Sequence, residues 1–168
     1  ALETLHFSDG SKINLAGLVF NPATGALLAV STDTHSTPAD DFIVTNATTA
    51  ATGNFGDDVL LGGAANNNLQ GGEGDDWLVG GMGADTLRGG AGIDTVSYAG
   101  SDGTTGVNVN LSLTTAQATV TGAESTGDLI SEVENVVGSQ HNDTLTGNND
   151  HNILRGLRGN DVISGGGG

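Results

Sequence analysis

The sequence has 168 residues, enough for one domain or two small ones, and it contains no cysteine, which excludes disulfides as a source of stability. Twenty Asp and Glu against four Lys and Arg give a net charge of −16, which argues against nucleic acid as a partner. With 29 glycines and only 4 % aromatic residues, the chain is either a disordered acidic segment or one that folds by taking up cations.

The first 52 residues precede the regular part of the sequence and are expected to form a flanking β segment and a linker. Leu18–Phe20 and Ala26–Val30 flank the turn-forming residues Asn-Pro-Ala-Thr-Gly, a pattern that predicts a β-hairpin. Residues 31–41 have the composition of a loop. Residues 41–52 are predicted to be a degenerate copy of the repeat that follows.

A nine-residue unit then repeats five times without a slip over residues 53–97. It reads GNFGDDVLL, GGAANNNLQ, GGEGDDWLV, GGMGADTLR and GGAGIDTVS. The sixth position holds an acid or amide in Asp58, Asn67, Asp76, Asp85 and Asp94. The eighth position is apolar in Leu60, Leu69, Leu78, Leu87 and Val96. Two columns at a fixed period indicate an architecture of stacked repeats.

Residues 98–137 interrupt the repeat, since Asp94 and Asp143 are 49 residues apart and 49 is not a multiple of nine. One strand is predicted from the alternating residues Val107, Val109, Leu111 and Leu113. A second is predicted from Ala116, Ala118 and Val120. Together they favour an insertion with a β-hairpin that packs beside the repeats, with a ligand-binding surface as the alternative.

The repeat resumes over residues 138–168 with GSQHNDTLT, GNNDHNILR and GLRGNDVIS. Its two columns are Asp143, Asn152 and Asp161, and Leu145, Leu154 and Ile163. The last four residues are glycines that stop in mid-pattern, and the N-terminus lacks the basic start of a signal peptide. We therefore expect this second block to be truncated and the chain to be part of a longer protein.

The units from Gly71, Gly80 and Gly89 match G-G-x-G-x-D-x-U-x, with U apolar, at every fixed position. They resemble the RTX (repeats-in-toxin) nonapeptide of hemolysin-type, type I secreted bacterial proteins. The resemblance implies an all-β fold: a right-handed parallel β-roll with two sheets of short strands and calcium-binding turns. Residues 3–10 are similar to the segment around Glu134, which implies that the N-terminus is the tail of an earlier roll.

Turns of this composition suit calcium better than other metals. Six residues of each unit favour a tight turn and three favour a short strand, so stacked turns bring together carboxylates and backbone carbonyls. Calcium takes six to eight such hard oxygen ligands, whereas magnesium demands a tighter octahedron and zinc prefers sulfur or nitrogen. We expect roughly four to six Ca²⁺ ions, which would offset much of the negative charge.

The resemblance also implies the ligands, which come from two stacked turns at a time. In the first block, Asn54, Gly56 and Asp58 would face Gly71, Glu73 and Asp76; Gly72, Gly74 and Asp76 would face Gly89, Ala91 and Asp94; and Gly63, Ala65 and Asn67 would face Gly80, Met82 and Asp85. In the second block, Ser139, His141 and Asp143 would face Gly156, Arg158 and Asp161. Gly81, Gly83, Gly90 and Gly92 occupy the remaining ligand positions of the complete units.

Several turns depart from the pattern. Asn67 and Asn152 replace the acid, which predicts weaker binding or none. Ala65, His141 and Asp150 replace the glycine of the fourth position, where a side chain disfavours positive φ. The partners of Asp85 and Asp94 in the following turns are expected to fall in the insertion, where the pattern fails.

No catalytic motif is present. The four histidines share no H-E-x-x-H pattern, a G-x-S-x-G elbow is missing, and no segment is apolar enough to span a membrane. Acidic pairs such as Asp57-Asp58 and Asp75-Asp76 recur in the repeat, which favours calcium ligation over a glycosidase site. The lone Trp77 is expected to lie on the surface, where a sugar is the alternative partner.

We therefore expect a calcium-binding module, not an enzyme, that folds outside the cell and aids the secretion, folding and stability of a larger protein. Its expected partners are calcium and the type I secretion machinery. One alternative is an adhesin or surface-layer module that binds glycans or neighbouring copies. Another is an accessory domain of a secreted enzyme whose catalytic part lies elsewhere.

Overall fold

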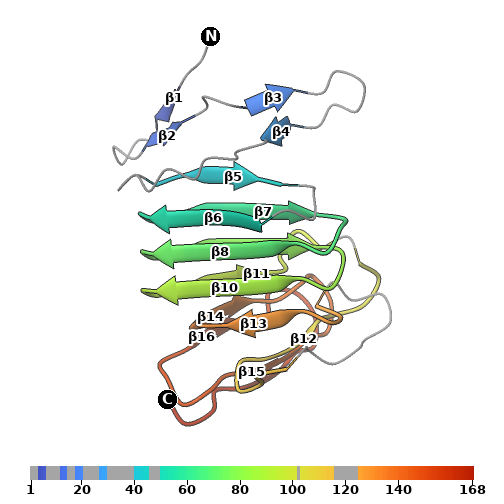
Figure 1. Cartoon of the computed structure of the whole chain (residues 1–168). Helices are drawn as coiled ribbons and strands as arrows, with labels where there is room; N and C mark the ends of the chain where they lie inside the picture. The colour runs from blue at the N-terminus through green and yellow to red at the C-terminus, as the bar shows by residue number, and fades with distance from the viewer. Residues whose placement is uncertain are drawn as a thin grey trace.

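A computed structural model of the chain describes residues 4–6, 12–14, 18–20, 27–29, 40–45, 50–101, 103–115 and 125–168, the first four ranges as backbone only. All regular structure in these residues is β, and none of them forms a helix that is long and apolar enough to cross a membrane. Short strands stack in parallel to form a solenoid (Figure 1), which confirms the predicted parallel β-roll.

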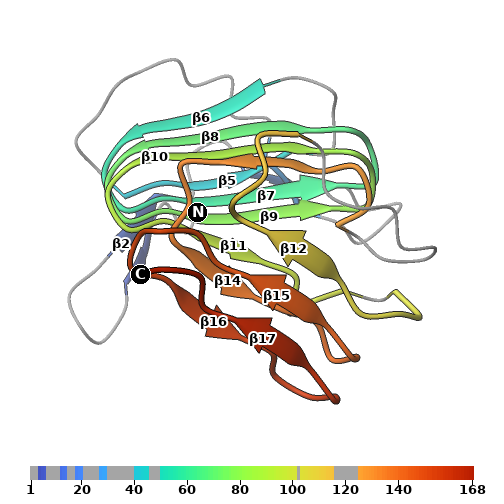
Figure 2. The same cartoon turned by 90° about the horizontal axis from the view of Figure 1, so that it is seen from below.

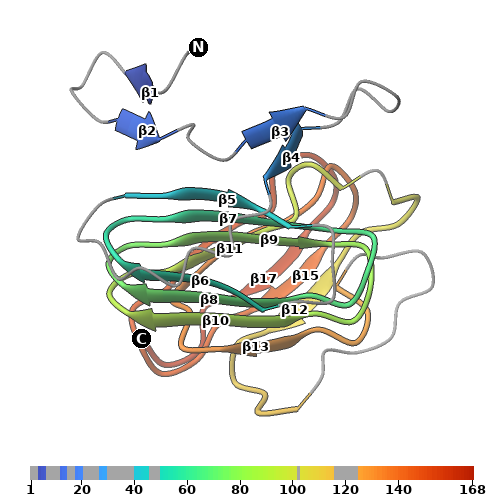
Figure 3. The ribbon, with the colours of Figure 1, turned by 45° about the horizontal axis from the view of Figure 1, so that its top comes forward.

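Three parallel sheets build the solenoid. The β8 sheet contains β6 (Ala50–Phe55), β8 (Asn68–Glu73), β10 (Thr86–Ala91) and β13 (Leu129–Ser131). The β9 sheet contains β5 (Phe42–Val44), β7 (Val59–Gly63), β9 (Trp77–Gly81), β11 (Thr95–Ser97), β14 (Asn135–Val137) and β16 (Ile153–Arg155). The β15 sheet contains β12 (Asn108–Asn110), β15 (Thr144–Thr146) and β17 (Val162–Ser164). Figure 3 shows the chain winding between the β8 and β9 sheets.

Apolar residues of the eighth position form much of the core between these sheets, although Ile163 in the last unit is 49 % exposed. Leu60 pairs with Leu78 across one sheet, and Leu69 pairs with Leu87 across the other, each 18 residues further along the chain. All four leucines are 0 % exposed. Side chains alternate in and out along a strand, so a nine-residue period places one apolar residue inward in every half-coil. Each buried leucine contributes about 1.5–3 kcal/mol of hydrophobic free energy.

The described residues of segment 98–137 contribute three strands to the roll. β13 pairs with β10, and β14 lies between β11 and β16, so both continue the stack. β12 precedes β13 in sequence but pairs in parallel with β15, at the edge of that sheet opposite β17 (Figure 2). The second strand of the predicted hairpin, residues 116–120, lies outside the described residues.

The N-terminal strands pair differently. β3 (Leu18–Phe20) and β4 (Leu27–Ala29) are antiparallel, which confirms the predicted hairpin. β1 (Thr4–His6) and β2 (Lys12–Asn14) are also antiparallel, in contrast to the parallel roll. β5 and β6 pair in parallel with β7 and β8, so residues 41–52 do include a degenerate coil.

Candidate metal-binding turns

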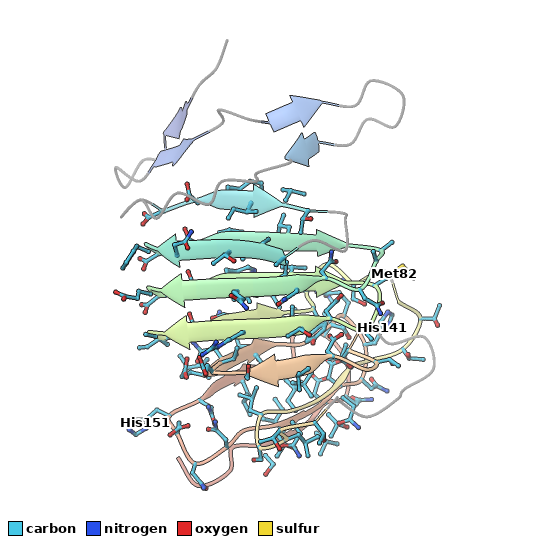
Figure 4. All side chains as sticks on the ribbon, in the orientation of Figure 1. Met82, His141 and His151 are labelled. Carbon is cyan, nitrogen blue, oxygen red and sulfur yellow. The ribbon has the colours of Figure 1, made fainter. Side chains whose placement is uncertain are left out.

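Turns between the sheets lie along two edges of the roll. We define the Asp76 edge as the turns that enter the β9 sheet: residues 53–58, 71–76, 89–94, 132–134 and 147–152. We define the Asp85 edge as the turns that leave it: residues 62–67, 80–85, 125–128, 138–143 and 156–161. Figure 4 shows Met82 and His141 on one edge and His151 on the opposite edge, as the alternation of half-coils predicts.

Carboxylates of the sixth position form a ladder that links successive coils. The backbone N–H of Asp58 donates to Oδ1 of Asp76 at 2.8 Å, and the N–H of Asp76 donates to Oδ1 of Asp94 at 2.9 Å. On the other edge, the N–H of Asn67 donates to Oδ1 of Asp85 at 2.8 Å. Each carboxylate therefore uses one oxygen to hold the turn of the coil before it.

In four of the turns, the second carboxylate oxygen has no hydrogen-bond partner among the described residues. Oδ2 of Asp58, Asp76, Asp85 and Asp94 is buried and accepts no hydrogen bond. Each of these oxygens lies over the first glycine of its own unit, where a methyl group would collide with it. A buried unpartnered anionic oxygen is costly, so four equivalent ones beside a small cradle fit a bound cation.

Acids of the fifth position have a different role. Oδ1 of Asp57 accepts the N–H of Asp75 at 2.8 Å, and Oδ1 of Asp75 accepts the N–H of Ile93 at 2.8 Å. This exposed ladder runs from the earlier coil to the later one, opposite to that of the sixth position. In each acidic pair, the fifth-position acid therefore braces the outer turn, and the sixth-position acid presents a free oxygen inside it.

Turns with free oxygens share an unusual backbone, which we call the open conformation. Their second and fourth positions have positive φ, as in Gly72 at 129° and Gly74 at 132°. A side chain at either residue would also collide with a carbonyl oxygen of the preceding coil, from Asn54 and Gly56 respectively. Glycine at these two residues accommodates both the positive φ and the close approach of stacked carbonyls.

Three turns adopt another conformation, which we call closed. Their second-position N–H donates to the sixth-position side chain of the same turn: Gly63 to Asn67 at 2.9 Å, Ser139 to Asp143 at 2.7 Å and Asn148 to Asn152 at 2.8 Å. None of these second positions has positive φ. The same three turns carry Ala65, His141 and Asp150 in place of the fourth glycine, so loss of that glycine coincides with a turn that satisfies its own oxygen.

The profile of a known repeat family matches these turns. It is described as the RTX calcium-binding nonapeptide repeat, in four copies, and it matches residues 51–74, 61–96 and 137–168. These segments are RTX calcium-binding nonapeptide repeats. The RTX repeat is a structural, calcium-binding unit, so the chain contains a calcium-binding module. No curated protein matches the chain.

Along the Asp76 edge, the structure stacks the turns that hold the RTX ligand positions of the first block. The turns of Asp58, Asp76 and Asp94 stack on one another, and Asn54, Gly72 and Gly90 pair in register. Positions 80–85, including Gly80, Gly81, Met82 and Gly83, form an open turn on the other edge, stacked on the closed turn of Gly63, Ala65 and Asn67.

In the second RTX block the predicted ligands split between the two conformations. The turn from Ser139 to Asp143 is closed, and Ser139 Oγ donates to Asp143 Oδ1 at 2.6 Å. His141 Nε2 lies 2.8 Å from the carbonyl oxygen of Gly103. The turn from Gly156 through Arg158 to Asp161 stacks on it in the open conformation, with Leu157 at φ 69° and Gly159 at 126°.

Two carboxylates outside the repeats join the ladders. Oδ1 of Asp128 accepts the N–H of Asp85 at 2.9 Å, and Oε2 of Glu134 accepts the N–H of Asp94 at 2.8 Å. Both partners lie in the insertion, as expected, and the carboxylate ladder continues there although the nine-residue pattern does not. Asp128-Leu-Ile and Glu134-Asn-Val keep the acid two residues before the buried residue, which was the signal available in the sequence.

Asp128 differs from the RTX aspartates in the fate of its second oxygen. Tyr98 Oη donates to Oδ2 of Asp128 at 2.7 Å, and both residues are buried. The Tyr98 hydroxyl thus satisfies the oxygen of Asp128 that a cation would satisfy in an open turn.

Burial perturbs the titration of the free carboxylates. Desolvation raises the pKa of Asp58 to about 7, although the N–H of Asp41 opposes the rise and the charge of Asp76 adds to it. Desolvation likewise raises the pKa of Asp76, Asp85 and Asp94 to about 6. A divalent cation beside these groups would favour their ionised forms.

Side chains alone do not assemble a metal site. Among the described residues, no group of three or more His, Cys, Asp or Glu converges as metal ligands. Each candidate RTX site instead combines two carboxylates with stacked backbone carbonyls. Such all-oxygen sets are typical of calcium.

Proposed function

We propose that the chain is a calcium-driven folding module, in which cations bound between stacked turns complete the roll. One observation carries the proposal: Oδ2 of Asp58, Asp76, Asp85 and Asp94 is buried, negatively charged when ionised, and without a partner. Aligned carboxylates raise each other's free energy, since the charge of Asp76 contributes to the raised pKa of both Asp58 and Asp94. Calcium would remove both costs together.

Two sites on the Asp76 edge are the best supported. One lies between the turns of Asp58 and Asp76, and the other between those of Asp76 and Asp94. All three turns are open, and each has its unpartnered oxygen. Asp85 offers the equivalent oxygen on the opposite edge, but the turn stacked before it is closed, so a site there would have fewer ligands. The turn of Asp143 supplies no free oxygen, which disfavours the predicted site with Asp161.

Calcium concentration would decide whether the module folds. Extracellular calcium modules have a Kd of about 10⁻⁴–10⁻³ M. A site at ten times its Kd gains about 1.4 kcal/mol, and several sites together match a large part of a small domain's stability. In a cytosol poor in calcium this contribution vanishes. The module would then stay unfolded inside the cell and fold outside it.

This behaviour suits a secreted or cell-surface protein that is exported unfolded. We propose that the module aids the secretion, folding and stability of a larger protein exported by type I machinery, and that it has no catalytic role. The repeat family and the net charge of −16 support this reading. An accessory role for an enzyme encoded in the same protein is compatible with it.

Glycan binding has weaker support. Trp77 is 39 % exposed and lines a groove on the outer face of the β9 sheet together with Thr95, Asn135 and Arg155. The groove encloses only about 120 Å³, whereas ligand pockets usually enclose about 300–1,000 Å³. A glycan array probed in calcium would reveal such binding.

Small-angle scattering tests the folding proposal. A compact chain of this length has a radius of gyration of about 15 Å, and an unfolded one about 43 Å. We expect the radius to fall sharply when calcium is added to metal-free protein. A compact radius that is the same with and without calcium would contradict the proposal.

A further inference from the structure

The carboxylate ladder of the Asp76 edge continues beyond the RTX repeats. Oε2 of Glu134 accepts the N–H of Asp94 at 2.8 Å, as Oδ1 of Asp94 accepts the N–H of Asp76 at 2.9 Å. Strand register agrees, because Thr95 pairs with Asn135 directly after these acids. Glu134 therefore occupies the next sixth position, although it lies outside the segments that match the repeat family.

The second carboxylate oxygen of Asp94, which faces this step of the ladder, lacks a hydrogen-bond partner. Asp94 is 0 % exposed, and its Oδ2 has no hydrogen-bond partner. A methyl group at Gly89 would collide both with this oxygen and with the carbonyl oxygen of Glu132. The same pair of collisions occurs at Gly53, with Asp58 Oδ2 and the Gly71 carbonyl oxygen. Two oxygens thus converge beside Gly89 as they do in the best-supported site.

The backbone of Glu132 has positive φ, like the second and fourth positions of the open turns. Its φ is 53°, in the left-handed region that non-glycine residues rarely adopt. Arg88 holds its side chain through two hydrogen bonds of 2.8 Å, on the outer face of the β8 sheet. The carbonyl oxygen of Glu132 accepts the N–H of Gly90 at 3.1 Å. The side chain is thereby kept away from the turn, and the carbonyl is placed at it.

We propose that this rung is a further calcium site, a proposal that rests on the proposed function. The open turn 89–94 would contribute Asp94 Oδ2 and the carbonyl oxygens of Gly90 and Gly92. The facing segment would contribute the Glu132 carbonyl and the Glu134 carboxylate. Only residues 132–134 stand opposite a six-residue turn, so the site offers fewer carbonyls and binds more weakly than the sites with Asp76.

Such a site has a consequence for assembly of the roll. It would join the last turn of the first repeat block to β14, which in turn pairs with β16 of the second block. Calcium bound there would hold the second repeat block against the first, across residues that the profile of the repeat family does not match.

Ion counting by native mass spectrometry, with calorimetric titration, tests the site in the whole chain. Glu134→Gln keeps an acceptor for the Asp94 N–H and removes the charge. We expect it to bind one ion fewer than the wild type, and calcium to protect the amides of β14 from hydrogen exchange less well. Asp150→Asn, which removes the same charge from an exposed side chain on the same edge, should match the wild type.

The outcomes separate the two proposals. If the wild type binds no calcium, the proposed function fails. If the wild type binds calcium and Glu134→Gln binds the same number of ions with the same affinities, only the further site is overturned. Should Glu134→Gln not fold, Glu134→Asp decides, because it keeps the charge and retracts the carboxylate by one methylene. One weakened site supports the proposal, and unchanged binding overturns it.

Discussion

Asp76 accepts the backbone N–H of Asp58, 18 residues earlier, through Oδ1 at 2.8 Å and leaves Oδ2 buried without a partner. One oxygen of this carboxylate thus bonds to the preceding coil, and the other places negative charge in the space between the two coils. The hydrogen bond to Oδ1 forms whether or not the Asp76 carboxyl group is protonated, whereas Oδ2 is stabilised only by a proton or a cation. We therefore expect the stability of the fold to depend on bound metal.

Asp76 is shared by the two best-supported sites, so Asp76→Asn should damage both. The amide oxygen still accepts the N–H of Asp58, but the charge is lost. We expect the calcium midpoint of folding to rise at least about tenfold, equivalent to about 1.4 kcal/mol. Circular dichroism against calcium concentration measures the midpoint.

Asp75→Asn is the matched control for that substitution, because Asp75 is exposed and uses its Oδ1 only in the outer ladder toward Ile93. Its midpoint should change by less than about 0.5 kcal/mol. Equal effects of the two substitutions would show that overall charge, and not a site, sets the calcium dependence.

Opening the closed turn of Asn67 should create binding capacity. Asn67→Asp alone restores the acid, but Ala65 still disfavours the open backbone, so we expect no additional ion. The double variant Ala65→Gly/Asn67→Asp restores the complete repeat pattern and should bind one more ion than the single variant. Native mass spectrometry in calcium counts the ions. A gain already complete in the single variant would contradict the link between the fourth glycine and the open turn.

Acid should partly replace calcium. In the metal-free roll, burial raises the pKa of Asp58 to about 7 and those of Asp76, Asp85 and Asp94 to about 6, above the value of 3.8 in an unfolded chain. Groups with a raised folded-state pKa stabilise the fold fully below pH 4, and this stabilisation is lost as pH rises through about 6 to 7. Metal-stripped protein should therefore gain β signal in circular dichroism between pH 7.5 and pH 4.

Calcium binding must follow the opposite trend, since the ligands have to be deprotonated. Affinity should fall as the pH drops below about 7, and calorimetry in buffers of different ionisation enthalpy should detect proton release on binding. An affinity that does not change between pH 7.5 and pH 5.5 would show that these carboxylates are not the ligands.

Tyr98→Phe should destabilise the roll without changing its calcium count. Only the hydroxyl that donates to Asp128 is removed, in a region where both residues are buried. Loss of a hydrogen bond to a buried carboxylate costs about 1.5–3 kcal/mol of the free energy of unfolding. Thermal melts in saturating calcium measure the loss. An unchanged melting temperature would mean that the hydroxyl contributes no net stability.

The repeat columns predicted much of this structure, because period and side-chain type determine which residue faces inward. Leu60, Leu69, Leu78 and Leu87 are fully buried as expected, and the degenerate coil before Gly53 pairs in register. Substitution of the fourth glycine also indicated which turns would be altered, since that position needs positive φ.

Other features depend on three-dimensional contacts that no local pattern contains. β12 skips past β13 to pair with β15, and Ser125 Oγ accepts the N–H of Asn108 at 3.1 Å. Glu134 accepts the N–H of Asp94 from a turn of only three residues, 132–134. The nine-residue period had ended, so the sequence offered only the short acid-x-apolar signal there.

Calcium-dependent folding is tested most directly by far-ultraviolet circular dichroism of the whole chain at pH 7.5 in calcium, in magnesium and in chelator. We predict a β spectrum in millimolar calcium, a largely unfolded spectrum in chelator, and little recovery in magnesium, which suits these multi-carbonyl sites poorly. The same β spectrum in all three solutions would contradict the account.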